Sequence, residues 1–95
     1  MKTIIYNIIN ELTDESYIEI LRILPSLNIE GIKEDDLVFY PLNIDAIKSE
    51  KRFLISANKI AYKYLENLDY KIEKILEEYN ISYYKKEIEK NEKYK

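Results

Sequence analysis

Residues 2–12, Lys-Thr-Ile-Ile-Tyr-Asn-Ile-Ile-Asn-Glu-Leu, decide between the two folds that this sequence permits. A helix advances by about 100° per residue, and at that angle the apolar residues of the segment gather on one side. They are Ile4, Ile5, Ile8, Ile9 and Leu12. A half-buried strand would alternate apolar and polar residues, but here both faces would carry isoleucines. We therefore predict a helix over residues 2–12.

A second helix is predicted to begin at residues 13–16, Thr-Asp-Glu-Ser. Thr13 or Asp14 can accept hydrogen bonds from the free amide groups of the first turn, and the early carboxylates suit the positive end of the helix dipole. The residues that follow are apolar around most of the circumference, which predicts a helix at the centre of the core. Pro25 ends it, because the residue before a proline disfavours the helical conformation.

The segment 28–44 is irregular and contains one clear strand candidate. Residues 37–40, Leu-Val-Phe-Tyr, are the β-branched, aromatic and aliphatic types that suit a strand, and Pro41 follows them directly. Gly31 can turn the chain upstream of this strand. Residues 28–32 can then pair with it as a short hairpin.

One apolar stripe with a single helical phase dominates the chain from Asp45 onward, and it predicts a helix over residues 46–79 capped by Asp45 or Ser49. Its members are Leu54, Ala57, Ala61, Leu65, Leu68, Ile72, Ile75 and Tyr79. A continuous helix of this length would span about 50 Å, which is longer than a small domain is wide. The helix therefore either breaks near residues 67–69 and folds back, or it pairs with a second chain. In the second case the heptad-like spacing predicts a dimer face made of Leu65, Leu68, Ile72, Ile75 and Tyr79.

The predicted fold is one domain over residues 1–95 that is mainly α. It is a small helical domain with a long C-terminal helix or helix pair and at most one short β-hairpin. Residues 81–88 fit a strand or a short helix, and the charged tail 88–95 is expected to fray. The alternative is an α+β fold with ferredoxin-like order. It requires strands at residues 2–9, 28–32, 36–41 and 81–88.

Most of the groups that enzymes use are missing from the composition. The 95 residues include no His, no Cys and a single Gly. Without His, acid–base catalysis needs paired carboxylates, yet residues 35–36 and 77–78 are acidic neighbours that do not share a helix face. Zinc loses its usual ligands, and phosphate-binding loops need several glycines. We predict that the protein is not an enzyme and that it uses no metal and no cofactor.

The composition also predicts where the protein acts. No apolar run approaches the roughly 20 residues that span a bilayer, and no signal peptide is recognisable. Without Cys there is no disulfide framework that would require an oxidising compartment. Residues with AT-rich codons, such as Ile, Asn, Lys and Tyr, are abundant, which is typical of a low-GC bacterium or one of its phages. We therefore expect a cytoplasmic protein.

Two charged surfaces are candidates for contact with a partner. The first is a basic stripe on one side of the predicted long helix, and it consists of Lys48, Arg52, Ile55, Lys59, Tyr62 and Lys63. Tyr and Arg are enriched among the residues that contribute most to binding energy. The second is an acidic loop before the strand candidate, and it consists of Glu30, Glu34, Asp35 and Asp36. Carboxylates beside aromatic residues can imitate the charge pattern of nucleic acid.

From these observations we predict a non-enzymatic protein-binding module whose partner is a larger protein and which makes no contact with a membrane. Small size, a net charge of −3 and the lack of catalytic groups suit an acidic phage or mobile-element inhibitor. Its target would be a bacterial nuclease or defence complex, as for anti-CRISPR and immunity proteins. One alternative is a nucleic-acid-binding regulator that uses the Lys48–Lys63 stripe, which the acidic net charge opposes. The other is a coiled-coil-like structural homodimer.

Overall fold

The structure, a computed structural model, describes residues 1–24 and 36–90 of the chain. Its elements are a four-stranded antiparallel sheet, three α-helices and a short 3-10 helix, η1. In chain order they are β1 (Lys2–Ile8), α1 (Asp14–Ile23), β2 (Leu37–Tyr40), α2 (Ile44–Glu50), β3 (Arg52–Ala57), η1 (Lys59–Ala61), α3 (Tyr62–Glu78) and β4 (Tyr83–Glu89).

The prediction of a mainly α fold is wrong, because the four strands form a sheet in the order β2-β3-β1-β4. All neighbouring strands in this sheet are antiparallel. The class is therefore α+β, the alternative among the two folds predicted from the sequence. Apart from α2, the elements follow the β-α-β-β-α-β order of ferredoxin-like folds.

Residues 2–8 form a strand rather than a helix, and their place at the centre of the sheet explains why. β1 pairs with β3 on one side and with β4 on the other. Ile4, Tyr6 and Ile8 are buried on one face of the strand, and Ile5 lies on the other. A central strand with apolar residues on both faces lacks simple alternation, so its isoleucines resemble the stripe of a helix.

The predicted helix over residues 46–79 is also wrong, because this segment contains most of α2 and all of β3, η1 and α3. α2 ends at Glu50, and its C-cap residue Lys51 adopts the left-handed conformation with φ of 58° and turns the chain into β3. The Lys51 carbonyl accepts a hydrogen bond of 2.8 Å from the Ile8 amide, which fixes the turn against β1. No glycine marks this turn in the sequence, so the apolar stripe continues through it without a visible break.

Two elements agree with the sequence, and a third decides an alternative that the sequence left open. The Thr13 side chain caps α1 by accepting a hydrogen bond of 3.2 Å from the Ser16 amide, and α1 ends at Ile23. β2 covers residues 37–40 as predicted. β4 shows that the segment 81–88 is largely strand, and it extends through two residues of the predicted frayed tail.

Other boundaries differ from the prediction. Asn43 caps α2 by accepting hydrogen bonds from two amides of the first turn, so neither Asp45 nor Ser49 is the cap. α3 continues through residues 67–69 without a break. The predicted strand at 28–32 lies outside the described residues, and β2 pairs with β3.

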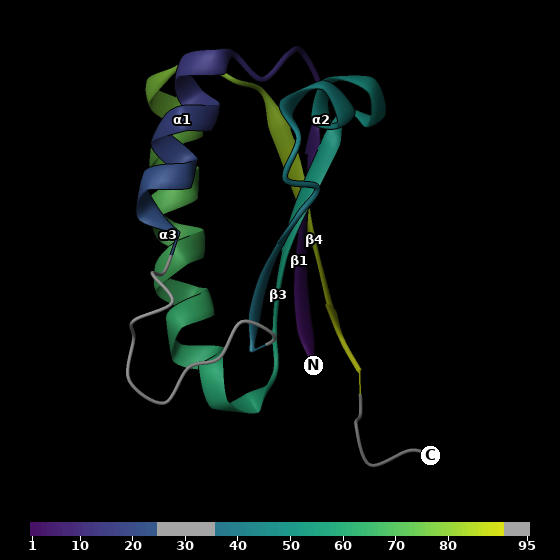
Figure 1. The fold of residues 1–95 in the computed structure, drawn as a ribbon, viewed down its shortest axis with the longest axis vertical. Coiled ribbons are helices and arrows are strands. Elements are labelled where there is room, and N and C mark those ends of the chain that lie inside the picture. Colours follow the sequence, from purple (N-terminus) through teal and green to yellow (C-terminus); the bar gives the residue numbers. More distant parts are fainter. Residues whose placement is uncertain (25–35, 91–95) are drawn as a thin grey trace.

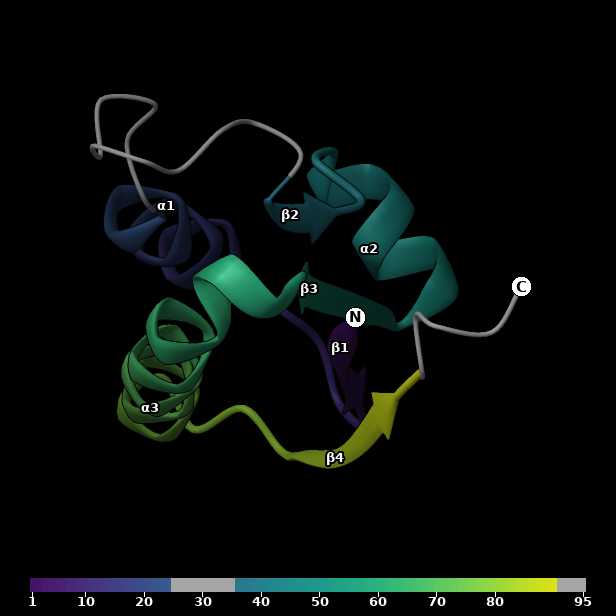
Figure 2. The same cartoon turned by 90° about the horizontal axis from the view of Figure 1, so that it is seen from below.

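Figures 1 and 2 show α1 and α3 side by side on one face of the sheet, with α2 apart from them beside β2 and β3. The core lies between the sheet and helices α1 and α3. The Tyr6 ring stacks on Phe53 with 4.7 Å between centroids, and Phe39 stacks on Phe53 at 5.3 Å. These rings pack β1, β3 and β2 together under the helices. Within residues 1–24 and 36–90, no helix has the length and apolar character that crossing a bilayer requires.

Candidate functional site

The face of the sheet that points away from α1 and α3 is the candidate functional site, and α2 lies on this side of the sheet beside β2 and β3 (Figure 2). Side chains alternate between the two faces of a strand, so every second residue of each strand belongs to this face. Burial of Tyr6, Phe39 and Phe53 identifies the positions that point toward the helices. The remaining positions, here called the open face, are Thr3, Ile5, Asn7, Val38, Tyr40, Arg52, Leu54, Ser56, Tyr84, Lys86 and Ile88.

The centre of the open face is aliphatic. Ile5 on β1 lies directly opposite Leu54 on the neighbouring strand β3, and both side chains are half-buried. In the next row, Thr3 lies opposite Ser56, and their hydroxyl oxygens are 2.9 Å apart in a hydrogen bond. These two hydroxyls satisfy each other, so they add little polarity to the surface.

Exposed tyrosines stand at both edges of the open face. Tyr40 on β2 is 57% exposed, and Tyr84 on β4 is 61% exposed. Val38, beside Tyr40 on β2, is 40% exposed. A single exposed apolar residue is ordinary, but several on one face are typical of an interaction surface.

The charge of the open face differs in sign from that of the helices. Arg52 and Lys86 are its two charged residues, and none of its eleven positions is acidic. Arg52 lies 3.8 Å from a carboxylate oxygen of Glu50, a long and exposed ion pair that leaves the guanidinium accessible. α1 and α3 together carry eight acidic and four basic residues. A chain of net charge −3 therefore presents a positive sheet face opposite an acidic helical layer.

A network of polar side chains lies on the opposite face of the sheet, between α3 and strands β1 and β4. The Tyr6 hydroxyl donates a hydrogen bond of 2.6 Å to Asp69, and Lys85 donates one of 2.9 Å to the second oxygen of the same carboxylate. Lys85 also lies 3.2 Å from Glu73, which accepts a hydrogen bond of 3.0 Å from the Tyr83 hydroxyl. Each of these groups has a partner, so the network attaches α3 to the sheet.

The pKa values of Tyr6, Tyr83 and Lys85 in this network are all raised, so these three groups stay protonated near neutral pH. Burial, reinforced by Asp69, raises the pKa of Tyr6. Burial and the hydrogen bond to Glu73 raise the pKa of Tyr83 to about 12. Burial acts to lower the pKa of Lys85, but the hydrogen bonds to both carboxylates outweigh it and the pKa is raised. A general acid or base works best with a pKa near the working pH, and these shifts move away from it.

The members of the predicted basic stripe are divided among four elements, and one of them lies in the core. Lys48 is on α2 and pairs with Asp14 at 3.1 Å. Ile55 is 0% exposed under the helices, whereas Arg52 points to the open face. The other members are Lys59 in η1 and Tyr62 and Lys63 at the start of α3.

The predicted dimer face lies in the core of a single chain. Leu65 and Ile72 are 0% exposed, Leu68 is 4% exposed and Ile75 is 8% exposed. Tyr79 is half-buried against the same core. These side chains face the sheet, so they are covered before any second chain approaches.

The predicted acidic loop falls mostly outside the described residues, which include only its last member, Asp36. The Asp36 carboxylate accepts a hydrogen bond of 2.6 Å from the side-chain amide of Asn58. Glu30, Glu34 and Asp35 lie outside the described residues. In the parts of the chain that are described, no three His, Cys, Asp or Glu residues form a group that could hold a metal ion.

The sequence alone does not mark Tyr40, Tyr84 and Lys86 as candidate functional residues. Each lies at an exposed position of a strand whose residues alternate between the two faces of the sheet. Which face a residue belongs to is known only after the strand and its register are known. No protein-family model, curated protein or solved structure matches this chain. The function is therefore inferred from the geometry of the open face itself.

Proposed function

We propose that this protein is a non-enzymatic protein-binding module that docks through the open face of its sheet. The observation that carries the proposal is the composition of that face. It combines exposed tyrosines, an aliphatic centre and two cations, with no acidic residue among its positions, in a chain that is acidic overall.

The layout of the open face supports a protein partner. Interfaces typically have an apolar centre that becomes dry and a polar rim that stays wet, with Tyr and Arg enriched. Here Ile5 and Leu54 provide the centre, while Tyr40, Tyr84 and Arg52 stand around it. The tyrosines lose little side-chain freedom when they bind, so they contribute contact area at low entropic cost.

A nucleic-acid partner fits this face less well. Sheets that bind single strands place flat aromatic rings where bases can stack, and several cations follow the phosphate backbone. The two central strands here contribute Ile5 and Leu54 at the middle of the face, and the cations are Arg52 and Lys86 only. A protein surface is the better match.

The charge of the open face defines the chemistry of the partner surface. Because Arg52 and Lys86 are its charged residues, the complementary surface carries carboxylates around an apolar patch. An inhibitor that mimics nucleic acid would instead present carboxylates to a basic groove. If the protein is an inhibitor, the surface that it binds on its target is therefore acidic, not the basic groove that a nucleic-acid mimic would occupy.

Affinity capture with matched variants tests the proposal. Tagged wild-type protein is exposed to a nuclease-treated lysate of a low-GC bacterium, alongside the double variant Tyr40→Ala/Tyr84→Ala. Tyr70→Ala is the control. Tyr70 is 58% exposed on α3, so this substitution removes an equally accessible tyrosine from the helical side of the molecule.

The expected result is one protein retained in stoichiometric amount by wild type and by Tyr70→Ala, and lost by the double variant. Retention by all three proteins contradicts docking through the open face. Recovery of nucleic acid alone, in samples without nuclease, replaces the protein partner by the nucleic-acid alternative.

A further inference from the structure

A small pocket lies at the end of the sheet where β1 leads toward α1 and where α2 turns into β3. Its floor is made of Ile8, Leu12 and Ile47, which are 6%, 1% and 0% exposed. The pocket has a volume of about 110 Å³. That is the space of roughly three to four water molecules at about 30 Å³ each, enough for a short aliphatic chain.

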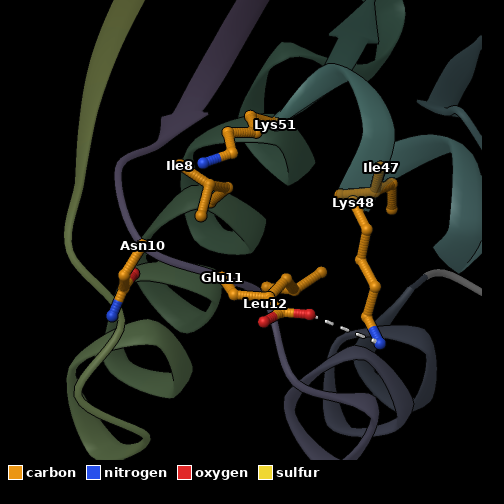
Figure 3. A pocket seen from close by; sticks show the side chains of 7 residues that line it. All are labelled: Ile8, Asn10, Glu11, Leu12, Ile47, Lys48 and Lys51. Carbon is orange, nitrogen blue, oxygen red and sulfur yellow. Dashed lines mark ion pairs between the residues drawn. The ribbon is translucent and has the colours of Figure 1, made fainter.

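Among the described residues, one of the two lysines that line the pocket has no carboxylate partner. Figure 3 shows Lys51 beside Ile8 on one side of the pocket, while Lys48 and Glu11 meet on the other. Lys48 lies 3.1 Å from Asp14 and 3.8 Å from Glu11, so two carboxylates balance its charge. Within the described part of the chain, Lys51 has no ion-pair partner.

The walls of the pocket are held in place before any ligand arrives. The side-chain oxygen of Asn10 accepts a hydrogen bond of 3.0 Å from the Ser82 amide, and its nitrogen donates one of 3.2 Å to the Asn80 carbonyl. The hydrogen bond from the Ile8 amide fixes the backbone of Lys51. A preformed pocket loses little entropy on binding.

We propose that this pocket binds a carboxylate carried on a short aliphatic chain. The chain packs on the floor of Ile8, Leu12 and Ile47, and the carboxylate pairs with the Lys51 ammonium. Glu11 disfavours the anion, so removing its charge strengthens binding. The carboxylate belongs either to a free short-chain acid or to an acidic side chain of a protein. This site is separate from the open face and does not depend on the proposed function.

Methyl NMR with labelled Ile and Leu tests the proposal directly. Butyrate, 1-butanol and butylammonium are titrated into the full chain as probes of the same chain length and different charge. The expected result is saturable shifts of the Ile8, Leu12 and Ile47 methyl groups with butyrate, with Kd in the millimolar range. Equal affinity for butyrate and 1-butanol, or no shifts at these methyls, overturns the proposal.

Charge variants locate the binding group. Lys51→Asn removes the ammonium, and Asn tolerates the left-handed backbone at this position, so the fold is retained. It is expected to weaken butyrate binding about fivefold, whereas Lys59→Asn in η1 leaves binding unchanged. Glu11→Gln is expected to strengthen it about two- to fivefold. Unchanged binding in Lys51→Asn, or weaker binding in Glu11→Gln, contradicts the assigned geometry.

A blocked peptide, acetyl-Gly-Glu-Gly-amide, distinguishes the two sources of the carboxylate. Tighter binding of the peptide than of butyrate at the same methyl groups assigns a protein side chain. Tighter binding of butyrate assigns a free acid. Both results require the Lys51→Asn effect, and the proposal fails if neither probe shows it.

Discussion

The hydroxyl of Tyr6 lies 2.6 Å from a carboxylate oxygen of Asp69 and donates a hydrogen bond to it, joining the central strand β1 to α3. Tyr6 itself is 0% exposed, so its hydroxyl is shielded from solvent. The second oxygen of Asp69 is held by Lys85. One carboxylate on α3 therefore connects to two strands of the sheet.

Tyr6→Phe removes this hydrogen bond but keeps the ring that stacks on Phe53. Because the bond involves a charged acceptor, we expect the free energy of unfolding to fall by about 1.5–3 kcal/mol. Urea unfolding followed by circular dichroism measures it. Tyr84→Phe, which alters an exposed hydroxyl, is the control and is expected to change stability by less than about 0.5 kcal/mol. Equal urea midpoints for wild type and Tyr6→Phe would show that the bond adds no net stability.

Stability is expected to fall at alkaline pH. Burial first, then Glu73, raises the pKa of Tyr83 to about 12, and the pKa of Tyr6 and of Lys85 is raised as well. Above about pH 10 the unfolded chain releases these protons while the folded chain keeps them. The unfolded state then binds fewer protons, so the free energy of unfolding decreases as pH rises.

Urea midpoints at pH 7, 9, 10 and 11 check this dependence. They are expected to be nearly constant up to pH 9 and to fall between pH 10 and 11. Tyr6→Phe is expected to show a shallower fall, because one of the contributing groups is gone. A midpoint at pH 11 equal to that at pH 7 contradicts the protonation states assigned to the network.

Core position rather than dimer contact is expected to determine the effect of Ile72→Ala. Ile72 is 0% exposed between α3 and the sheet, so the truncation leaves a cavity and costs about 2–5 kcal/mol. Unfolding and light-scattering measurements together test this. Tyr70→Ala, on the exposed side of the same helix, is expected to cost less than about 0.5 kcal/mol. A change from a wild-type dimer to a folded Ile72→Ala monomer would restore the dimer hypothesis.

Local signals in the sequence predict part of the fold correctly. Thr13 caps α1 because its hydroxyl can reach an amide of the first turn, which depends on neighbouring residues only. The stripe from Leu65 to Ile75 buries one face of α3, as its helical phase requires. β2 is recognisable from its aromatic and β-branched residues and the proline that follows.

The sheet could not be predicted in the same way, because pairing between distant segments decides it. Residues 2–8 resemble a helix until β3 and β4 are placed on both sides of them. Lys51 turns the chain in a conformation for which glycine would have been the usual signal. The open face depends on the register of four strands, so Tyr40 and Tyr84 become part of one surface only in the folded chain.

Charge reversal on the open face is expected to weaken binding of the captured partner. The double variant Arg52→Glu/Lys86→Glu places like charges against the carboxylates of that partner, and we expect about a tenfold or greater loss of affinity. Lys63→Glu/Lys71→Glu on α3 changes the net charge equally and is expected to have little effect. Isothermal titration calorimetry at two salt concentrations measures both. Equal losses in the two double variants would indicate a general charge effect rather than docking at the open face.

Mapping the contact surface by NMR tests docking through the open face most directly. The uniformly labelled chain is titrated with the captured partner, and amide shifts are followed residue by residue. We expect the shifts to concentrate at residues 3–7, 38–40, 52–56 and 84–88, with α1 and α3 unaffected. Shifts concentrated on α1 and α3, with the strand amides unchanged, would contradict the proposed docking surface.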